Sequence, residues 1–346
     1  MFGLIFDIGD IAINIPSIAK MRFAMKIAIL LLDDFFDTGF TVTRDALRIA
    51  NKFSVLQLGG EVNFDVSVIG VKKKVRAYSG DFSINVMPVT ASMKPDVVIV
   101  PALAASSPDL LVPALQRKDV VAAKEHLKKW HKKGVKIAAS CIGSFILADA
   151  GILDQCEATT TWWLAPFFRQ RYPNVHLNED RMLVESGQVV TTGALMGHLD
   201  LALWLINRAS PQLASIVSRY MLANLRTDQA PYIIPNHLAK ADPLVASFEK
   251  WARINLKEGF SLPAAAKALA TSTRTLHRRC EEVLGKSPRD YFQDLRVEHA
   301  RHLLLSSSLD LDSIAAEVGY ENGYTLSRLL RDKLGRGIRE IRATIN

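Results

Sequence analysis

Cys141 lies where a β-rich run meets a helical pattern, a place where a cysteine can do chemistry. In VKIAASCIGSFILADAGILD, an apolar run over 135–140 precedes Cys141 and a helical stretch over 142–150 follows it. Gly143 would relieve crowding at a sharp turn between them. A nucleophile elbow needs this layout, because the strained turn exposes the side chain and the helix N-terminus favours a thiolate. The spacing therefore makes Cys141 a candidate nucleophile.

Two later residues could complete a triad with this cysteine. His198 and Asp200 follow a β-rich run over 188–193. The stretch HLDLALWLI, however, has the pattern of an amphipathic helix, and both residues would stand in its first turn. We favour this interpretation, in which they begin a packed helix, over a catalytic one.

A second group of polar side chains lies in two helix-turn-helix patterns near the C-terminus. Residues 261–284 predict a short helix, a tight turn near Ala270 and a second helix capped by Ser272. Residues 310–334 repeat this plan, with Gly319 at the turn. An internal duplication of this kind is a far more specific signal for DNA binding than one copy.

The second helix of each unit carries side chains suited to phosphates and base edges. Arg pairs well with guanine and Asn with adenine in the major groove. The expected DNA contacts are Ser272, Arg274, Thr275, His277 and Arg278 in the first unit, and Asn322, Tyr324, Thr325, Ser327, Arg328 and Arg331 in the second. A solvated helix face would explain either helix alone, but two copies in register favour DNA binding.

Between the two units, the sequence predicts a connecting helix that starts near Pro288. About eighteen helical residues span roughly 27 Å. A connector of this length could hold two recognition helices near the spacing of adjacent major grooves, roughly 34 Å. The expected partner is therefore double-stranded DNA.

The elements ahead of these units alternate between strands and helices. Strands are expected at 26–32, 63–70, 96–101, 135–140 and 188–193. Helices are expected at about 41–53, 109–133, 142–150, 162–171 and 197–223. This alternation predicts a doubly wound α/β domain with a mostly parallel sheet, whose apolar strands are buried on both faces. An all-α domain with two helix-turn-helix units follows it.

The domain boundaries follow from the same pattern. They are 1–24 for an N-terminal extension, 25–225 for the α/β domain, 226–243 for a proline-containing linker and 244–346 for the helical domain. The native start could be Met21 or Met25 rather than Met1. Acidic residues and a proline interrupt the extension, and no basic residue precedes its apolar part, so we expect neither an export signal nor a membrane span.

Composition limits the class of protein further. The chain has 346 residues and a formal net charge of +8, which suits a polyanionic partner without requiring one. Its three cysteines are far apart and lack the spacing of a metal site. We therefore expect no metal and a reducing, cytoplasmic environment.

Three stretches of the helical domain read STRTLHR, GKSPRDYFQDLRVEHARHLL and IAAEVGYENGYTLSRLLRDKLG. On these, residues 244–346 resemble the DNA-binding domain of AraC-family regulators. Leu326 and Leu329 stand where that family usually has Phe, and GRGIREIR replaces its usual ending. The elbow, ATTTWW and VVTTGALMGHLDLAL resemble the ThiJ/PfpI group of class I glutamine amidotransferase-like domains, which GlxA-like AraC regulators carry ahead of their DNA-binding domain.

This resemblance bears on whether Cys141 is catalytic. Enzymes of the group provide a His shortly after the elbow helix and a carboxylate after the first strand. Here Thr161 stands where related sequences often have His, and in DDFFDTGF the nearest acid is Asp37, whereas an ungapped count reaches Gly39. We expect no catalysis. Three roles for Cys141 stay open: a residue that lines a pocket, a redox or electrophile sensor, or a working nucleophile.

The resulting expectation is a sequence-specific transcription regulator that responds to a small-molecule effector and needs no cofactor. The ligand pocket is expected to include Cys141, Ile142 and Trp162, since at most one of the adjacent Trp162 and Trp163 would face it. A pocket tryptophan could hold an amine or a quaternary ammonium compound by cation–π contact, a ligand class that the resemblance suggests.

We further expect a homodimer, because pairing two chains raises the effective concentration of their DNA-binding units. RNA polymerase is a further candidate partner, and no membrane is expected. The alternative function is a cysteine-dependent amidase, peptidase or glyoxalase-like hydrolase fused to a DNA-binding module.

Overall fold

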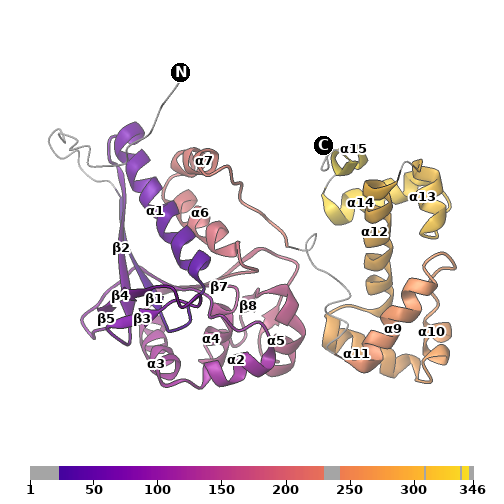
Figure 1. Cartoon of the computed structure of the whole chain (residues 1–346), viewed down its shortest axis with the longest axis horizontal. Helices are drawn as coiled ribbons and strands as arrows, with labels where there is room; N and C mark the ends of the chain where they lie inside the picture. Colours follow the sequence, from indigo (N-terminus) through magenta and orange to yellow (C-terminus); the bar gives the residue numbers. More distant parts are fainter. Residues whose placement is uncertain (1–22, 230–241, 308, 336, 343–346) are drawn as a thin grey trace.

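The chain forms an α/β part and a helical part that follows it (Figure 1). The computed structural model describes residues 23–229, 242–307, 309–335 and 337–342. Residues 1–22 of the expected extension (1–24) and residues 230–241 of the expected linker (226–243) lie outside the described residues. Within the described ranges, no helix is long and apolar enough to cross a bilayer.

The α/β part is built on a seven-stranded sheet in the order β10-β11-β7-β6-β1-β2-β5. Neighbouring strands are parallel except β10 and β11, which are antiparallel. The strands are β1 (Phe23–Leu31), β2 (Val62–Gly70), β5 (Met87–Pro88), β6 (Val97–Val100), β7 (Lys136–Ser140), β10 (Leu183–Ser186) and β11 (Val189–Thr192). The five predicted strands and the mostly parallel sheet are confirmed. Two further pairs were not predicted: β3 (Lys74–Arg76) with β4 (Ser83–Asn85), and β8 (Glu157–Ala158) with β9 (His176–Leu177).

The central strand β1 shows why this sheet needs helices on both faces. Ile27, Ile29 and Leu31 contribute to the core on one face, while Ala28 and Leu30 contribute to the core on the other. Successive side chains of a strand point to opposite faces, so an apolar run buries both of them. The strand could not remain exposed on either side.

Helices cover the two faces as separate sets (Figure 1). One core includes side chains from α1 (Asp37–Leu58), α6 (Gly197–Ala209) and α7 (Pro211–Tyr220). The other includes side chains from α2 (Pro108–Leu115), α3 (Lys118–Lys132), α4 (Gly143–Asp149), the 3₁₀ turn η1 (Trp162–Leu164) and α5 (Ala165–Arg171). The doubly wound prediction is therefore confirmed.

Two long predicted helices were wrong, because each is two helices. The expected helix over 197–223 breaks at Ser210, whose backbone is extended and whose side chain caps α7. Pro211 follows and cannot donate the hydrogen bond that a continuous helix requires. The expected helix over 109–133 breaks at Arg117, which is also extended and precedes α3.

The helical part contains two packed cores, one for each helix-turn-helix unit. Its helices are α9 (Pro243–Ile254), α10 (Leu262–Ala268), α11 (Thr273–Leu284), α12 (Pro288–Ser306), α13 (Leu311–Glu317), α14 (Gly323–Leu334) and α15 (Ile338–Arg342). The turn residues Ala270 and Gly319 both have positive φ, 50° and 76°. The duplicated unit and the connecting helix α12 are therefore confirmed.

The junction between the two parts begins later than expected. Residues 226–229 were assigned to the linker, but they are bound to the α/β part. The Thr227 carbonyl accepts a hydrogen bond from the Met182 amide at 3.0 Å, and Gln229 is fully buried. At the other ends, β1 starts at Phe23 and α9 at Pro243, within two residues of the predicted boundaries.

Candidate ligand cavity and nucleic-acid interface

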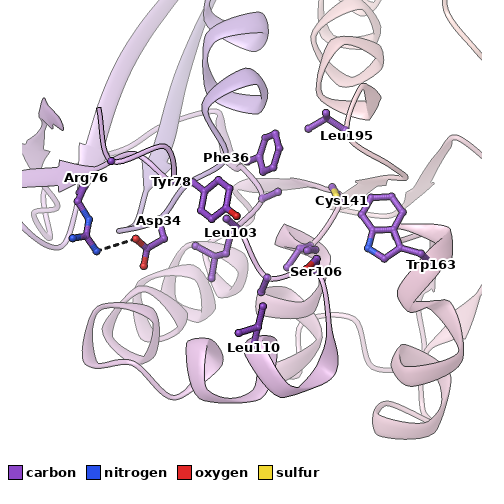
Figure 2. Close-up of a pocket in the computed structure, with 15 residues that line it drawn as sticks. Asp34, Phe36, Arg76, Tyr78, Leu103, Ser106, Leu110, Cys141, Trp163 and Leu195 are labelled. Carbon is purple, nitrogen blue, oxygen red and sulfur yellow. Dashed lines mark hydrogen bonds and ion pairs between the residues drawn. The ribbon is translucent and has the colours of Figure 1, made fainter. Parts of the chain in front are cut away.

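A cavity of about 560 Å³ opens at the carboxyl ends of the parallel strands (Figure 2). Asp34 comes from the loop after β1, Leu103 from the loop after β6 and Cys141 from the turn after β7. Leu195, after β11, and Trp163, in η1, complete this part of the wall. Open α/β sheets bind ligands at this edge, and the volume suits a small molecule.

Cys141 occupies a strained turn, as the elbow pattern predicted. Its φ is 55°, a left-handed conformation that non-glycine residues rarely adopt. The Cys141 amide donates to the Thr192 carbonyl at 2.8 Å. A Cβ on Gly143 would stand 2.4 Å from the Val100 carbonyl oxygen, so the helix can approach the neighbouring strand only without a side chain there.

The ionisation state expected for this cysteine was wrong. We expected the helix N-terminus to favour a thiolate, but burial raises the pKa of Cys141 to about 12. The side chain is 3% exposed, so the thiolate would lose most of its hydration. Desolvation outweighs the opposing hydrogen bond from the Ile142 backbone, and Cys141 is a neutral thiol at neutral pH.

His198 is not available as a base for this thiol. Its Nδ1 lies 2.7 Å from the Leu195 carbonyl oxygen, and its Nε2 accepts a hydrogen bond from the Ala102 amide at 3.1 Å. Burial lowers the pKa of His198 to about 4, so the ring stays neutral. Both ring nitrogens are therefore engaged by backbone groups. A Cβ on Gly39 would stand 2.6 Å from Nε2, which shows how closely the ring is packed.

The other residues considered for catalysis are buried or lie at the start of a helix. Thr161 is fully buried just ahead of η1, and Asp37 is the first residue of α1. Asp200 is 1% exposed and forms an ion pair with Arg226. These placements agree with the interpretation of His198 and Asp200 as residues of a packed helix start.

The expected tryptophan of the pocket was the wrong one of the pair. Trp163 lines the cavity, together with Cys141 and Ile142, whereas Trp162 packs against the core of the first helix-turn-helix unit. The two rings meet edge to face, with centroids 5.6 Å apart. The choice depended on where the helical part docks, which no local pattern reveals.

Sequence reasoning missed the wall formed around the loop after β1. Phe36 and Tyr78 line the cavity and stack on each other, with centroids 6.0 Å apart. The Asp34 carboxylate lines it too, and it pairs with Arg76 at 3.1 Å and with Arg117 at 2.8 Å. Two consecutive acids directly after a buried strand were the signal for this edge. Among the described residues, no three His, Cys, Asp or Glu side chains gather as a metal site.

The second helices of the two units, α11 and α14, begin at capped positions. The Ser272 hydroxyl accepts a hydrogen bond from the Thr275 amide at 3.0 Å. The side-chain Oδ1 of Asn322 accepts from the Thr325 amide at 2.9 Å and also from the Thr325 hydroxyl at 3.0 Å. These caps fix where each helix starts. Since the Asn322 cap uses only the side-chain oxygen, the side-chain nitrogen remains a donor for DNA.

The basic side chains of the two helices differ in what they already contact. Arg278 pairs with Glu282 at 2.6 Å, and His277 lies 3.3 Å from Glu281. Arg274, Arg328 and Arg331 are exposed and make no ion pair with any residue that the structure describes. Tyr324 is 80% exposed, and Thr275 and Ser327 are half-buried. The expected DNA contacts stay predictions. The three unpaired arginines could contact DNA without first breaking an ion pair.

The departures from the AraC pattern are accommodated in the second core. Leu326 is fully buried, Leu329 packs against the same core, and Ile341 of α15 completes it at 3% exposure. Leu side chains therefore serve where the family usually has Phe.

Comparisons with known proteins match the two parts separately. The model of the DJ-1/PfpI family matches residues 25–208, and the model of a helix-turn-helix domain matches residues 265–344. The chain is 25% identical over 342 residues to the HTH-type transcriptional regulator CdhR of Pseudomonas aeruginosa, covering 91% of each chain. It is 29% identical over 227 residues to the HTH-type transcriptional regulator ArgR of the same species, covering 62% of this chain and 67% of the relative.

Among solved structures, an AraC family transcriptional regulator from Pseudomonas putida is similar over 57% of this chain and 99% of its own. Its TM-score is 0.47 and its sequence identity is 17%.

Proposed function

The chain belongs to the DJ-1/PfpI family and carries an AraC-type helix-turn-helix domain, and we propose that this DNA-binding transcription regulator responds to a small molecule bound in its α/β domain. The observation that carries the proposal is that one chain combines a ligand cavity with a DNA-binding part. A cavity at the ligand-binding edge of the sheet is followed by two capped recognition helices with exposed arginines.

The effector we propose is an amine or a quaternary ammonium compound. Phe36, Tyr78 and Trp163 line the cavity, and aromatic faces attract cations by about 0.5–2 kcal/mol each. The Asp34 carboxylate adds negative charge at the same wall, although Arg76 and Arg117 neutralise part of it. The aromatic surface is therefore the main support for this ligand class.

We propose that the α/β domain is not catalytic. A cysteine nucleophile requires a thiolate and a group that moves protons. The high pKa of Cys141 and the engaged nitrogens of His198 support this proposal. Multiple turnover that depends on Cys141, on small amides, peptides or α-oxoaldehydes, would overturn it.

We propose that two chains act together and that the protein works in the cytoplasm, where its DNA is. One chain offers two short recognition helices, and dimerisation would raise specificity through effective concentration. RNA polymerase is the proposed partner for any activation. Light scattering should give twice the monomer mass for the free chain, or the mass of two chains plus the duplex when DNA is bound. A monomer at micromolar concentration, with and without DNA, would contradict the proposed dimer.

The test of the whole proposal is selection of binding sites from genomic DNA by the full-length protein. We expect an enriched sequence, bound with an affinity that falls steeply with salt as phosphate contacts release counterions. The control is a variant with Arg274→Ala and Arg328→Ala, which should lose the enrichment. Equal binding of random and genomic DNA by the wild-type protein at moderate salt would refute the proposal.

A further inference from the structure

One short segment of the α/β part touches both the cavity and the first helix-turn-helix unit. The 3₁₀ turn η1 holds Trp163, whose ring lines the cavity, and Trp162, which packs against the core of the first unit. α5 continues from η1 without a break and packs against α11. The segment from Trp162 to Arg169 is therefore shared by the two sites.

Polar contacts hold the carboxyl end of α11 on this segment. Arg169 donates to the Val283 carbonyl at 2.9 Å and pairs with Glu179 at 2.6 Å. The Glu179 side chain is 8% exposed and that of Arg169 19%, so the pair is largely shielded from water. Gly285 ends α11 so close to this pair that a Cβ on it would stand 2.5 Å from the Arg169 guanidinium.

An ion-pair chain extends the same contact toward the second unit. Lys286 lies 3.1 Å from Asp180 of the α/β part and 3.2 Å from Asp294 of α12. Asp294 in turn pairs with Lys333 of α14 at 2.9 Å. Burial alone would lower the pKa of Lys286, but the two carboxylates outweigh it and hold the pKa above its usual value. The lysine is thus charged and bound from both sides.

The start of α11 stays exposed, at Thr273 and Arg274. Trp162 packs against the first core, and Arg169 binds the carboxyl end of α11. Lys286, just after the C-cap of α11, pairs with the α/β part. Arg274, at the other end of α11, is exposed. Helix-turn-helix proteins read bases with the amino-terminal residues of the recognition helix. The contact therefore sets the position of the first unit without covering its DNA-reading end.

We propose that the segment from Trp162 to Arg169 couples the cavity to the first helix-turn-helix unit. A molecule that displaces Trp163 moves the turn that also carries Trp162. This movement loosens the packing of α11 against α5. The two rings pack against each other, and the Leu164 amide is bonded to the Thr161 carbonyl at 3.2 Å, so the turn moves as one piece. The proposal rests on the proposed function of the cavity as a ligand site.

The test measures hydrogen–deuterium exchange of the full chain without DNA, in peptides covering residues 280–287. Trp163→Ala should speed exchange there about threefold or more, because local opening becomes easier when one anchor of the turn is lost. Arg169→Ala, which removes a direct contact, should do the same. Phe36→Ala is the matched control: it removes an aromatic ring from the cavity, but Phe36 follows β1 and lies outside the coupling segment.

Three results would overturn the proposal. Exchange unchanged by Trp163→Ala would show that the wall does not act on α11, and equal acceleration by Phe36→Ala would show that any cavity damage has this effect. Exchange unchanged by Arg169→Ala would show that the contact between α5 and α11 does not form in solution. Should Trp163→Ala fail to fold, Trp163→Leu applies the same test with a smaller loss of volume. Since no DNA is present, failure here is distinct from a failure to find a binding sequence, which would refute the proposed function instead.

Discussion

The thiol of Cys141 should be far less reactive than its elbow position suggests. Burial raises the pKa of Cys141 to about 12. At pH 7.5 a thiol with the usual pKa of about 8.5 is roughly 10% ionised, whereas one with a pKa near 12 is ionised to about 0.003%. Because the thiolate is the attacking species, alkylation should be roughly 3,000-fold slower than for an ordinary thiol, before any steric protection.

The chain provides its own references for this measurement. Iodoacetamide labelling of the native protein, followed by mass spectrometry of the peptides, reports each cysteine separately. Cys156 is the partly exposed reference. Cys280 is the matched one, because burial also raises its pKa to about 12 but it lies within helix α11 rather than at a strained turn.

We expect Cys141 and Cys280 to label at similar slow rates, and both to accelerate together in denaturant. Labelling of Cys141 at a rate within tenfold of Cys156, or with a midpoint below pH 9, would refute the argument from burial. It would also show that the turn activates the thiol, and it would strengthen the case for a sensor or a nucleophile.

Four substitutions at other sites give further predictions. Arg328→Ala should weaken specific DNA binding by roughly 1–3 kcal/mol in fluorescence anisotropy, and Arg278→Ala by less, because Arg278 must first leave an ion pair that contributes about 0.3–0.5 kcal/mol. The pKa of His198, about 4 against 6.5 for the free side chain, means that the unfolded state takes up a proton first. The free energy of unfolding should therefore fall as pH drops from 6.5 toward 4, by up to about 3 kcal/mol, and urea titrations of His198→Gln should show a shallower dependence. Arg226→Ala removes the guanidinium from the buried Asp200, which keeps the hydrogen bond from the backbone amide of residue 226, and should cost roughly 3 kcal/mol in urea denaturation; a loss below about 0.5 kcal/mol would mean that water replaces the arginine.

Local patterns predicted those parts of the fold that depend on local physics. The alternation in β1 requires two buried faces, and Ser272 and Asn322 each cap a helix by accepting from an amide three residues away. The elbow at Cys141 was predictable for the same reason, since strand, turn and helix are consecutive in the chain. Such features are encoded within one window of the sequence.

Contacts between distant segments were beyond this kind of inference. Whether Trp162 or Trp163 faces the cavity depends on how the helical part packs against the α/β part. This packing includes a hydrogen bond between Arg169 and Val283, which are 114 residues apart. The neutral state of Cys141 has a similar origin, because the thiol is buried in a core that includes side chains from distant strands and helices. In both cases a tertiary contact decided between alternatives that the sequence left open.

The strain at Cys141 also has a structural reason that is independent of its thiol. The turn is held by its backbone: the Cys141 amide donates to Thr192, and the carbonyl accepts from the Ser144 hydroxyl at 2.7 Å and the Thr160 hydroxyl at 3.4 Å. A left-handed residue costs of order 1–2 kcal/mol, which hydrogen bonds of this number can offset. Thr160 connects this turn to the end of the α/β part, since its carbonyl accepts from the buried Gln229 at 2.9 Å. The elbow thus serves as a rigid floor for the cavity, tied to the last described residues before the helical part, and this role requires neither a thiolate nor a base.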